Sequence, residues 1–191
     1  MPNWNKNYLE IEGDEKQKKK MLKSLKKGGM SAVLGFNYDG KNGDEIRSLN
    51  LEQLGTKWDI DPRELKEVKI KGKKVLSFDT AWSPPVEFVY NASKKYPGLK
   101  LRLLAVEPGF EYLGELKVKN GKTLKSYDCD LSNIRDSKCK RIFNEVHKRV
   151  KADKNETWLN NVLNDYKKLN TQKMNEDNKK GGLLNLAFWR K

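Results

Sequence analysis

The chain has 191 residues, of which 40 are lysine or arginine and 26 are aspartate or glutamate, so its formal net charge is +14. No stretch approaches the ~20 apolar residues of a membrane span, and no signal-peptide core is present, so we expect a soluble cytoplasmic protein. Two cysteines, Cys129 and Cys139, and one histidine, His147, are too few for a zinc site. Reduced thiols are expected, and a disulfide is left open.

Alternating apolar residues and turn signals predict a β-α-β-β-α-β order in the first half of the chain. Asp14 opens the first helix, and Gly28-Gly29 stops it after about Lys27. Residues 37–54 predict a loop with one helical turn. Strands are expected over 4–11, 55–60, 74–81, 99–106 and 110–118, with 68–71 adding to a hairpin.

The second helix is expected over 84–95. Ser83 is a good N-cap, and Pro84-Pro85 fit the first turn, where missing N–H groups cost nothing. Asn120-Gly121 is a strong turn signal that we take as the end of the sheet. The predicted units are therefore a sheet domain over 1–120, a helical appendage over 121–180 and an apolar tail over 181–191.

The appendage predicts a helical hairpin. Apolar residues recur at helical spacing over 138–151, and Asp153 with Glu156 resembles a capping box that starts a second helix. Trp158 is expected on the inner face of that second helix. After a Gly181-Gly182 hinge, the tail either docks on its own domain or anchors a partner through Phe188 and Trp189.

Two lysine-rich helix faces are the candidate electrostatic sites. Basic faces attract phosphate backbones of RNA or DNA, although lysine-rich solvated faces are also common. If both faces lie on one side of the molecule, they form one continuous phosphate-binding surface. The candidates are Lys140, Arg141, Lys148, Arg149 and Lys151 on one helix, and Lys19, Lys20, Lys23, Lys26 and Lys27 on the other.

Trp58 and Trp82 have two interpretations. Exposed aromatic rings can stack unpaired bases, but large aromatic residues also supply most of a small core. The aromatic motif of RNA-recognition domains is absent. We therefore expect both tryptophans to be packing residues.

Catalytic residues are hard to find in this sequence. No nucleophile or orienting partner can be named for His147, so it is expected to be an ordinary, partly exposed side chain. Asp59, Asp61, Asp79 and Glu107 could gather at strand ends around a divalent metal, as in a metal-dependent nuclease. Capping of turns or pairing with lysine is the favoured interpretation, and no cofactor or metal is expected.

Two short motifs and their flanks form a distinctive set in the first 120 residues. These are Asn3-Trp4, Gly55-Thr56-Lys57-Trp58-Asp59, Thr80-Ala81-Trp82-Ser83-Pro84-Pro85, Tyr96-Pro97 and Glu107-Pro108-Gly109. The set resembles the YubB-like ferredoxin-like family of plasmid and phage proteins over about residues 1–120. The resemblance implies a ferredoxin-like α+β sandwich with an added antiparallel strand, followed here by the helical hairpin. It implies no catalytic residues and a structural role for the motifs.

Charge and lineage together predict a non-enzymatic binding protein from a mobile element. The leading hypothesis is an antagonist of a host defence protein or ribonucleoprotein, such as a CRISPR RNA-guided effector, whose RNA or RNA channel it engages through basic surfaces. The alternatives are a nucleic-acid-binding accessory protein and a metal-dependent nuclease. The oligomeric state is left open.

Overall fold

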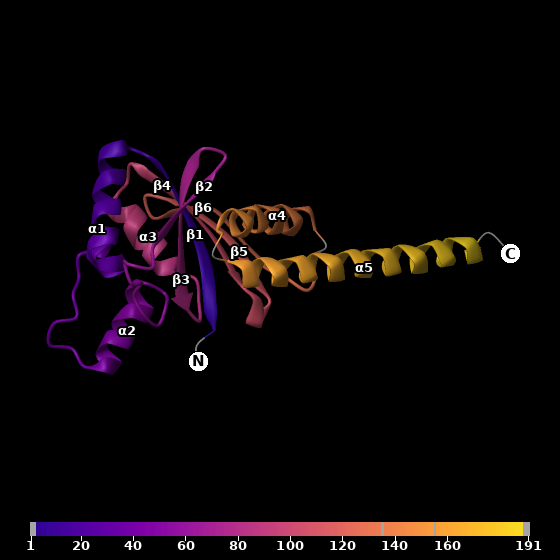
Figure 1. The fold of residues 1–191 in the computed structure, drawn as a ribbon, viewed down its shortest axis with the longest axis horizontal. Coiled ribbons are helices and arrows are strands. Elements are labelled where there is room, and N and C mark those ends of the chain that lie inside the picture. Colours follow the sequence, from indigo (N-terminus) through magenta and orange to yellow (C-terminus); the bar gives the residue numbers. More distant parts are fainter. Residues whose placement is uncertain (1–2, 135, 155, 189–191) are drawn as a thin grey trace.

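The chain folds around a six-stranded sheet that carries helices on both faces (Figure 1). The computed structural model describes residues 3–134, 136–154 and 156–188, with side chains of the last stretch described to Glu176. The strands are β1 (Trp4–Gly13), β2 (Lys66–Ile70), β3 (Lys73–Ala81), β4 (Leu99–Glu107), β5 (Tyr112–Lys119) and β6 (Lys122–Asp130). The helices are α1 (Glu15–Leu34), α2 (Gly43–Gln53), α3 (Val86–Lys95), the 3-10 turn η1 (Pro108–Phe110), α4 (Ser137–Ala152) and α5 (Thr157–Phe188).

The strand order is β2-β3-β1-β4-β5-β6, with every neighbouring pair antiparallel. Its first four strands, with α1 and α3 as crossovers, form the predicted ferredoxin-like α+β arrangement. Two strands are added rather than one, because Asn120-Gly121 is the turn between β5 and β6 and not the end of the sheet. Both turn residues have positive φ, 48° and 67°, as a tight hairpin turn requires.

The strand that pairs with the outer edge of β3 is β2, and the strand expected over 55–60 does not form. Those residues make a chain of bends that leads from α2 to β2. The helix α2 is also longer than the single turn expected. Asn42 caps it through a capping box with Glu45, in which each side chain accepts from the other's backbone N–H.

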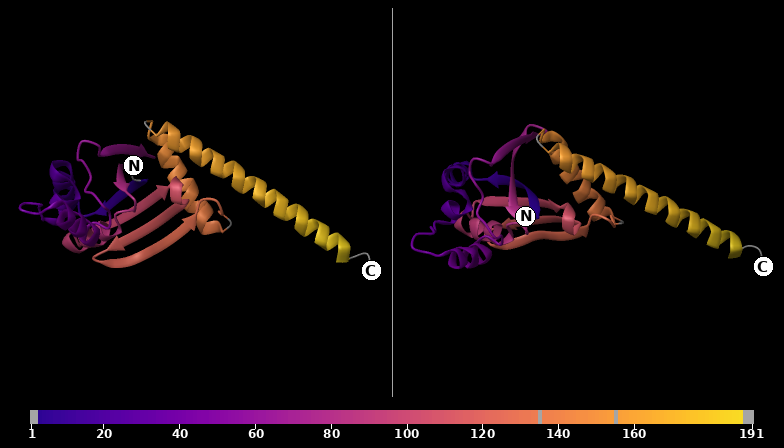
Figure 2. Two further views of the ribbon diagram at one scale, coloured as in Figure 1. Left: turned by 90° about the horizontal axis from the view of Figure 1, so that it is seen from below. Right: turned by 60° about the horizontal axis from the view of Figure 1, so that its bottom comes forward.

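The sheet separates two apolar cores because its central strands bury both faces. On one face Leu9 and Leu101 pack with α1 and α3, whereas on the other Tyr8 and Leu104 pack with α4 and the start of α5. The views in Figures 1 and 2 agree that α1 and α4 lie on opposite sides of the sheet. The sheet face that is open in a minimal ferredoxin-like sandwich is therefore covered here by α4.

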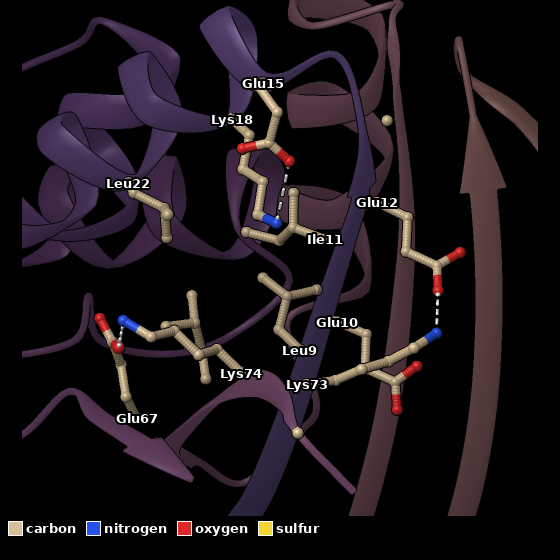
Figure 3. Close-up of a pocket in the computed structure, with 13 residues that line it drawn as sticks. Leu9, Glu10, Ile11, Glu12, Glu15, Lys18, Leu22, Glu67, Lys73 and Lys74 are labelled. Atoms are coloured by element: carbon tan, nitrogen blue, oxygen red, sulfur yellow. Dashed lines mark hydrogen bonds and ion pairs between the residues drawn. The ribbon is translucent and has the colours of Figure 1, made fainter. Parts of the chain in front are cut away.

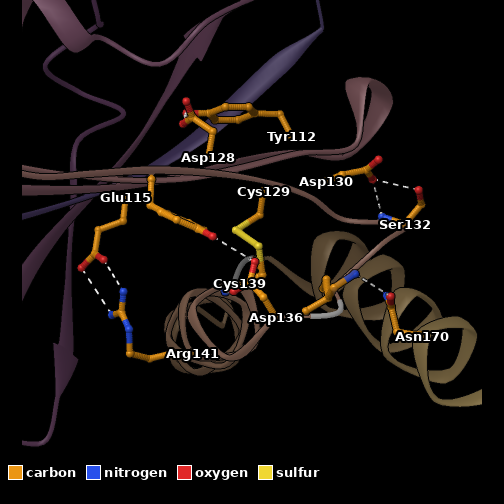
Figure 4. Close-up of a disulfide and its surroundings, with 12 residues drawn as sticks. Tyr112, Glu115, Asp128, Cys129, Asp130, Ser132, Asp136, Cys139, Arg141 and Asn170 are labelled. Carbon is orange, nitrogen blue, oxygen red and sulfur yellow. Dashed lines mark hydrogen bonds and ion pairs between the residues drawn. A yellow bond between two sulfur atoms is a disulfide. The ribbon is translucent and has the colours of Figure 1, made fainter. Parts of the chain in front are cut away.

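Ion pairs hold α4 against the sheet. Glu115 on β5 has a fully buried side chain, which accepts from Arg102 at 2.6 Å, from Lys125 at 2.9 Å, and from Arg141 of α4 (Figure 4). Burial alone would raise the pKa of Glu115, but these cations outweigh burial and lower it to about 2. Arg149 of α4 pairs in the same layer with Glu10 of β1.

A disulfide between Cys129 of β6 and Cys139 of α4 adds a covalent link, so the expectation of reduced thiols is wrong (Figure 4). Their Cα atoms are 5.7 Å apart, within the usual range for a disulfide. His147 also differs from expectation. It is buried between α4 and α5, where its Nε2 lies 3.2 Å from Asn160 Oδ1, and burial lowers its pKa.

The last helix, α5, is 32 residues long and its backbone continues through Gly181-Gly182, so the expected hinge does not form. Its first turns pack on α4 through Leu159 and Leu163, and the remainder projects away from the sheet (Figures 1 and 2). Phe188 ends the helix, and Trp189 lies outside the described residues. No helix within the described residues is long and apolar enough to cross a membrane.

Candidate functional site

The two tryptophan motifs lie side by side because a side-chain hydroxyl of each donates a hydrogen bond to a backbone carbonyl of the other. Thr56 Oγ1 donates to the carbonyl of Ala81 at 2.9 Å, and Ser83 Oγ donates to the carbonyl of Gly55 at 2.6 Å. Ser83 therefore does not cap α3, whose N-cap residue is Pro85 and has no side-chain hydrogen bond. The small and hydroxyl residues of the motifs fix two loops against each other.

Asp59 attaches the same loop to α1. Gly28 and Gly29 break the helical geometry inside α1, and the helix resumes at Met30 instead of ending. The Asp59 carboxylate accepts from the N–H groups of Met30 at 2.8 Å and Ser31 at 2.9 Å, which are free at the restarted helix. A Cβ on Gly29 would lie 2.8 Å from this carboxylate and from the Ile60 carbonyl, so the break requires glycine.

The four acidic residues considered for a metal site serve separate purposes. Besides Asp59, Asp61 pairs with Arg63, Asp79 pairs with Lys6 at 3.2 Å, and Glu107 accepts from the first N–H groups of η1. No cluster suited to a metal ion occurs among the described residues. The favoured interpretation, in which these carboxylates cap turns or pair with cations, is confirmed.

Trp58 and Trp82 are exposed, so the expectation that they pack in the core is wrong. Their exposed fractions are 43% and 53%, and Trp4 at the start of β1 is 51% exposed. The rings of Trp4 and Trp58 lie 6.1 Å apart, and the Lys57 ammonium lies 4.8 Å from the Trp58 ring and 5.1 Å from the Trp82 ring. We call Trp4, Trp58, Trp82 and the intervening Lys57 the tryptophan row.

The backbone of Trp82 supports the row at a conformational cost. Its φ is 77°, in the left-handed region that bulky residues rarely adopt. Its N–H donates to the carbonyl of Asn3 at 2.9 Å, one residue before Trp4. Such conformations persist only where the surroundings enforce them, and they are frequent at binding sites.

A groove of about 600 Å³ adjoins the row at Trp4. Trp158, at the start of α5, also lines it and is 69% exposed, so Trp158 is not on the inner face as expected. The remaining lining residues are Lys6, Arg63, Glu64, Lys66, Asp79, Pro108, Glu156 and Leu159.

Lys6 is the buried cation of this groove. Its Nζ lies 2.5 Å from Glu156, 3.2 Å from Asp79 and 3.9 Å from Asp153. Burial lowers the pKa of Lys6, but the surrounding carboxylates outweigh it and leave the pKa above its ordinary value. The ammonium therefore stays charged and holds the carboxylates in place.

The two predicted basic faces do not form one surface. On α1 the five lysines are exposed, and Lys26 pairs with Glu67 of β2 at 2.7 Å. Of the five candidates on α4, only Lys148 and Lys151 are exposed, because Lys140 is half-buried and Arg141 and Arg149 pair with sheet carboxylates. Since α1 and α4 lie on opposite faces of the sheet, a single strand cannot follow both directly.

A second hollow, of about 540 Å³, lies between α1 and the β2–β3 hairpin (Figure 3). Its floor is the apolar core itself, with Leu9, Ile11 and Leu22 directed into it. Ion pairs close its rim, among them Glu12 with Lys73 at 3.1 Å. With its charges already paired, this hollow presents little for a polar ligand to bind.

The sequence analysis singled out Trp58 and Trp82 but assigned them to the core. It did not predict that Trp4 or Trp158 belongs to a binding site. A usable signal was present, because Trp58 and Trp82 stand beside turn-forming residues and Trp4 begins a strand. Nothing in the sequence placed Trp158 near Trp4.

A comparison with protein families agrees with this fold. Residues 57–147 match the family model of the ferredoxin-like domain in Api92-like protein, a range that includes β2 to β6. The crystal structure of a protein api92 from Yersinia pseudotuberculosis is similar at 19% identity, with a TM-score of 0.37. That match covers 48% of this chain and 32% of the Yersinia protein, so this chain spans about a third of that protein's length. No curated protein matches. Residues 57–147 are therefore similar to the ferredoxin-like domain of Api92-like proteins.

Proposed function

We propose that this chain is a non-enzymatic binding protein that holds single-stranded nucleic acid on the tryptophan row. The observation that carries the proposal is a set of three exposed tryptophan rings in a protein of net charge +14. The Lys57 ammonium lies over two of these rings, Trp58 and Trp82, and the third, Trp4, lies beside Trp58. Proteins that bind single strands combine such rings, which stack on bases, with cations that follow the phosphates.

The rings are better explained as a ligand surface than as incompletely buried core. Exposed apolar area forgoes roughly 25 cal/mol per Å² of stabilisation, which is largest for tryptophan among the side chains. The left-handed backbone of Trp82 adds a local cost of about 1–2 kcal/mol. The exposure cost is retained at all three tryptophans and the backbone cost at Trp82, which favours a role in binding.

Unpaired bases fit this site better than a duplex. Stacking on a tryptophan needs a free base face, which a duplex offers only at its ends. The broad sheet face that RNA-recognition domains use is covered by α4, so the end of the sheet is left for stacking.

Lysines of α1 extend the row electrostatically. Lys20, Lys23 and Lys27 are exposed, and Lys27 lies three residues before Met30, whose N–H donates to Asp59 of the tryptophan loop. A strand stacked on the row can continue along this face with its phosphates near the ammonium groups.

The biological setting is a second part of the proposal. The plasmid and phage lineage implied by the motifs suits an antagonist of a host defence ribonucleoprotein, which would engage exposed guide RNA through the row. An accessory protein of replication or transfer would use the same surface on free single strands. Affinity for a free oligonucleotide, compared with affinity for the loaded ribonucleoprotein, separates the two.

The direct test measures fluorescence anisotropy of labelled single-stranded RNA and DNA at fixed salt. Stacking contributes about 1–3 kcal/mol per base, so Trp58→Ala and Trp82→Ala should each weaken binding roughly 5- to 150-fold. Leu124→Ala is the matched control, because Leu124 is 56% exposed on β6 near the β5–β6 turn and far from the row.

Unchanged affinity of both tryptophan variants would refute the proposal, as would an equally large effect of Leu124→Ala. Binding of duplex with the same affinity as the single strand would show that stacking is not the source of affinity.

A further inference from the structure

We propose that the groove between Trp4 and Trp158 binds one guanine base of the strand. This inference rests on the proposed function, because Trp4 belongs both to the tryptophan row and to the groove. A strand stacked on Trp58 and Trp4 therefore leads into the groove with its next base.

The walls of the groove suit a planar ring. Trp4 comes from the start of β1 and Trp158 from the first turn of α5, and both are more than half exposed. The volume of about 600 Å³ lies within the range of small-molecule sites and admits a nucleotide. Leu159 and Pro108 complete the apolar lining.

The hydrogen-bonding groups of the groove select among the bases. Asp79 and Glu156 are carboxylates, which accept hydrogen bonds when ionised and cannot donate. Lys6 holds one oxygen of each from below, which fixes their positions.

Guanine alone carries two adjacent donors, N1–H and the 2-amino group, on its Watson–Crick edge, and a carboxylate can accept both at once. Adenine and cytosine place an acceptor nitrogen beside their amino group, and uracil and thymine flank their single N–H with carbonyl oxygens. A carboxylate repels each of these acceptors.

The cations of the groove favour a nucleotide over a cationic peptide side chain. A groove with aromatic walls and carboxylates could also receive an ammonium or guanidinium group. The three cations that line the same groove, however, balance its three carboxylates, so the groove offers a cationic ligand no excess of negative charge. These residues are Lys6, Arg63 and Lys66, and Glu64, Asp79 and Glu156. Arg63 is 89% exposed at the rim, where it can meet a phosphate.

The test has two arms. In the first, mononucleotides are titrated against the whole protein, with binding followed by quenching of tryptophan fluorescence and by NMR. GMP should bind at least about tenfold more tightly than AMP, CMP or UMP. IMP lacks only the 2-amino group and should bind about tenfold more weakly than GMP. Trp158→Ala, at an exposed position that should not disturb folding, should abolish GMP binding.

In the second arm, oligothymidine strands with and without one guanine are compared by anisotropy. Wild type should prefer the guanine strand about tenfold. Asp79→Asn and Trp158→Ala should remove this preference while leaving affinity for oligothymidine, whereas Trp82→Ala should weaken both strands equally.

The outcomes separate the two proposals. Equal affinity for both strands, together with no preference for GMP, would overturn the guanine site while leaving the tryptophan row. Selective GMP binding without any binding of strands would support the groove and refute the strand-binding function. Binding of tetramethylammonium in the groove, together with no detectable binding of GMP, would overturn the inference in favour of a cationic ligand.

Discussion

Replacing Asp59 by alanine tests how the tryptophan loop is held. The variant removes the acceptor for the N–H groups of Met30 at 2.8 Å, Ser31 at 2.9 Å and Ile60 at 2.7 Å. All three residues are buried, so water can replace the carboxylate only in part. The restarted segment of α1 also loses its cap.

The expected cost follows from these hydrogen bonds. A hydrogen bond to a charged group contributes about 1.5–3 kcal/mol, and loss of an N-cap costs about 0.5–2 kcal/mol. The bonds share one carboxylate and are not additive, so we expect Asp59→Ala to lower the free energy of unfolding by about 2–4 kcal/mol. Asp59→Asn keeps one acceptor oxygen and should fall between this variant and wild type.

Urea unfolding followed by far-UV circular dichroism measures the decrease in stability. Asp61→Ala is the matched control, because Asp61 lies two residues away and pairs with the exposed Arg63, so no measurable decrease is expected. Gly29→Ala should be destabilised like Asp59→Ala, because its Cβ would meet the Ile60 carbonyl at 2.8 Å and its φ is +74°. Equal stability of Asp59→Ala and Asp61→Ala would refute the capping role.

Three further predictions test the docking of α4 and the charge of α1. Glu115→Gln removes the buried carboxylate that Arg102 and Arg141 share, while both arginines keep their ion pairs with Glu145. The variant should therefore lose about 1.5–3 kcal/mol in urea unfolding, the range for a hydrogen bond to a charged group. The pKa of Glu115 is lowered from 4.5 to about 2, so its contribution is complete above the unfolded value and should disappear as pH falls from about 4.5 to 2. A pH titration that leaves wild type and Glu115→Gln equally sensitive would contradict this. Reducing the disulfide between Cys129 and Cys139, ten residues apart, should cost about 2–3 kcal/mol by loop-closure entropy, and unfolding with and without dithiothreitol measures it. Neutralising Lys20, Lys23 and Lys27 to glutamine should make the slope of log K against log salt shallower by about 0.7 for each phosphate that is no longer neutralised. The same change at the exposed lysines of α4 should leave that slope unaltered.

Local pattern was enough for much of the fold. Alternation predicted β1, β3, β4 and β5, and helical spacing predicted α3 and α4, because these periodicities depend on which face of one element is buried. The prediction from local pattern was wrong at residues 55–60, where tryptophan and threonine suggested a strand. There, side-chain hydrogen bonds to the carbonyls of Ala81 and Gly55 hold a bent loop instead. Asn120-Gly121 was recognised as a turn, but a turn alone does not say whether another strand follows.

The sequence by itself determined the excess of positive charge, the α+β class and the two motifs that hold the tryptophan loops. Only the tertiary structure decided what these features form together. Three segments meet at one end of the sheet to expose Trp4, Trp58 and Trp82, and α5 adds Trp158 from far along the chain. It also assigned Arg141 and Arg149 to buried carboxylates while leaving the lysines of α1 in solvent. The physical reason is that exposure and ion pairing depend on which surfaces pack together, and a one-dimensional pattern does not contain that information.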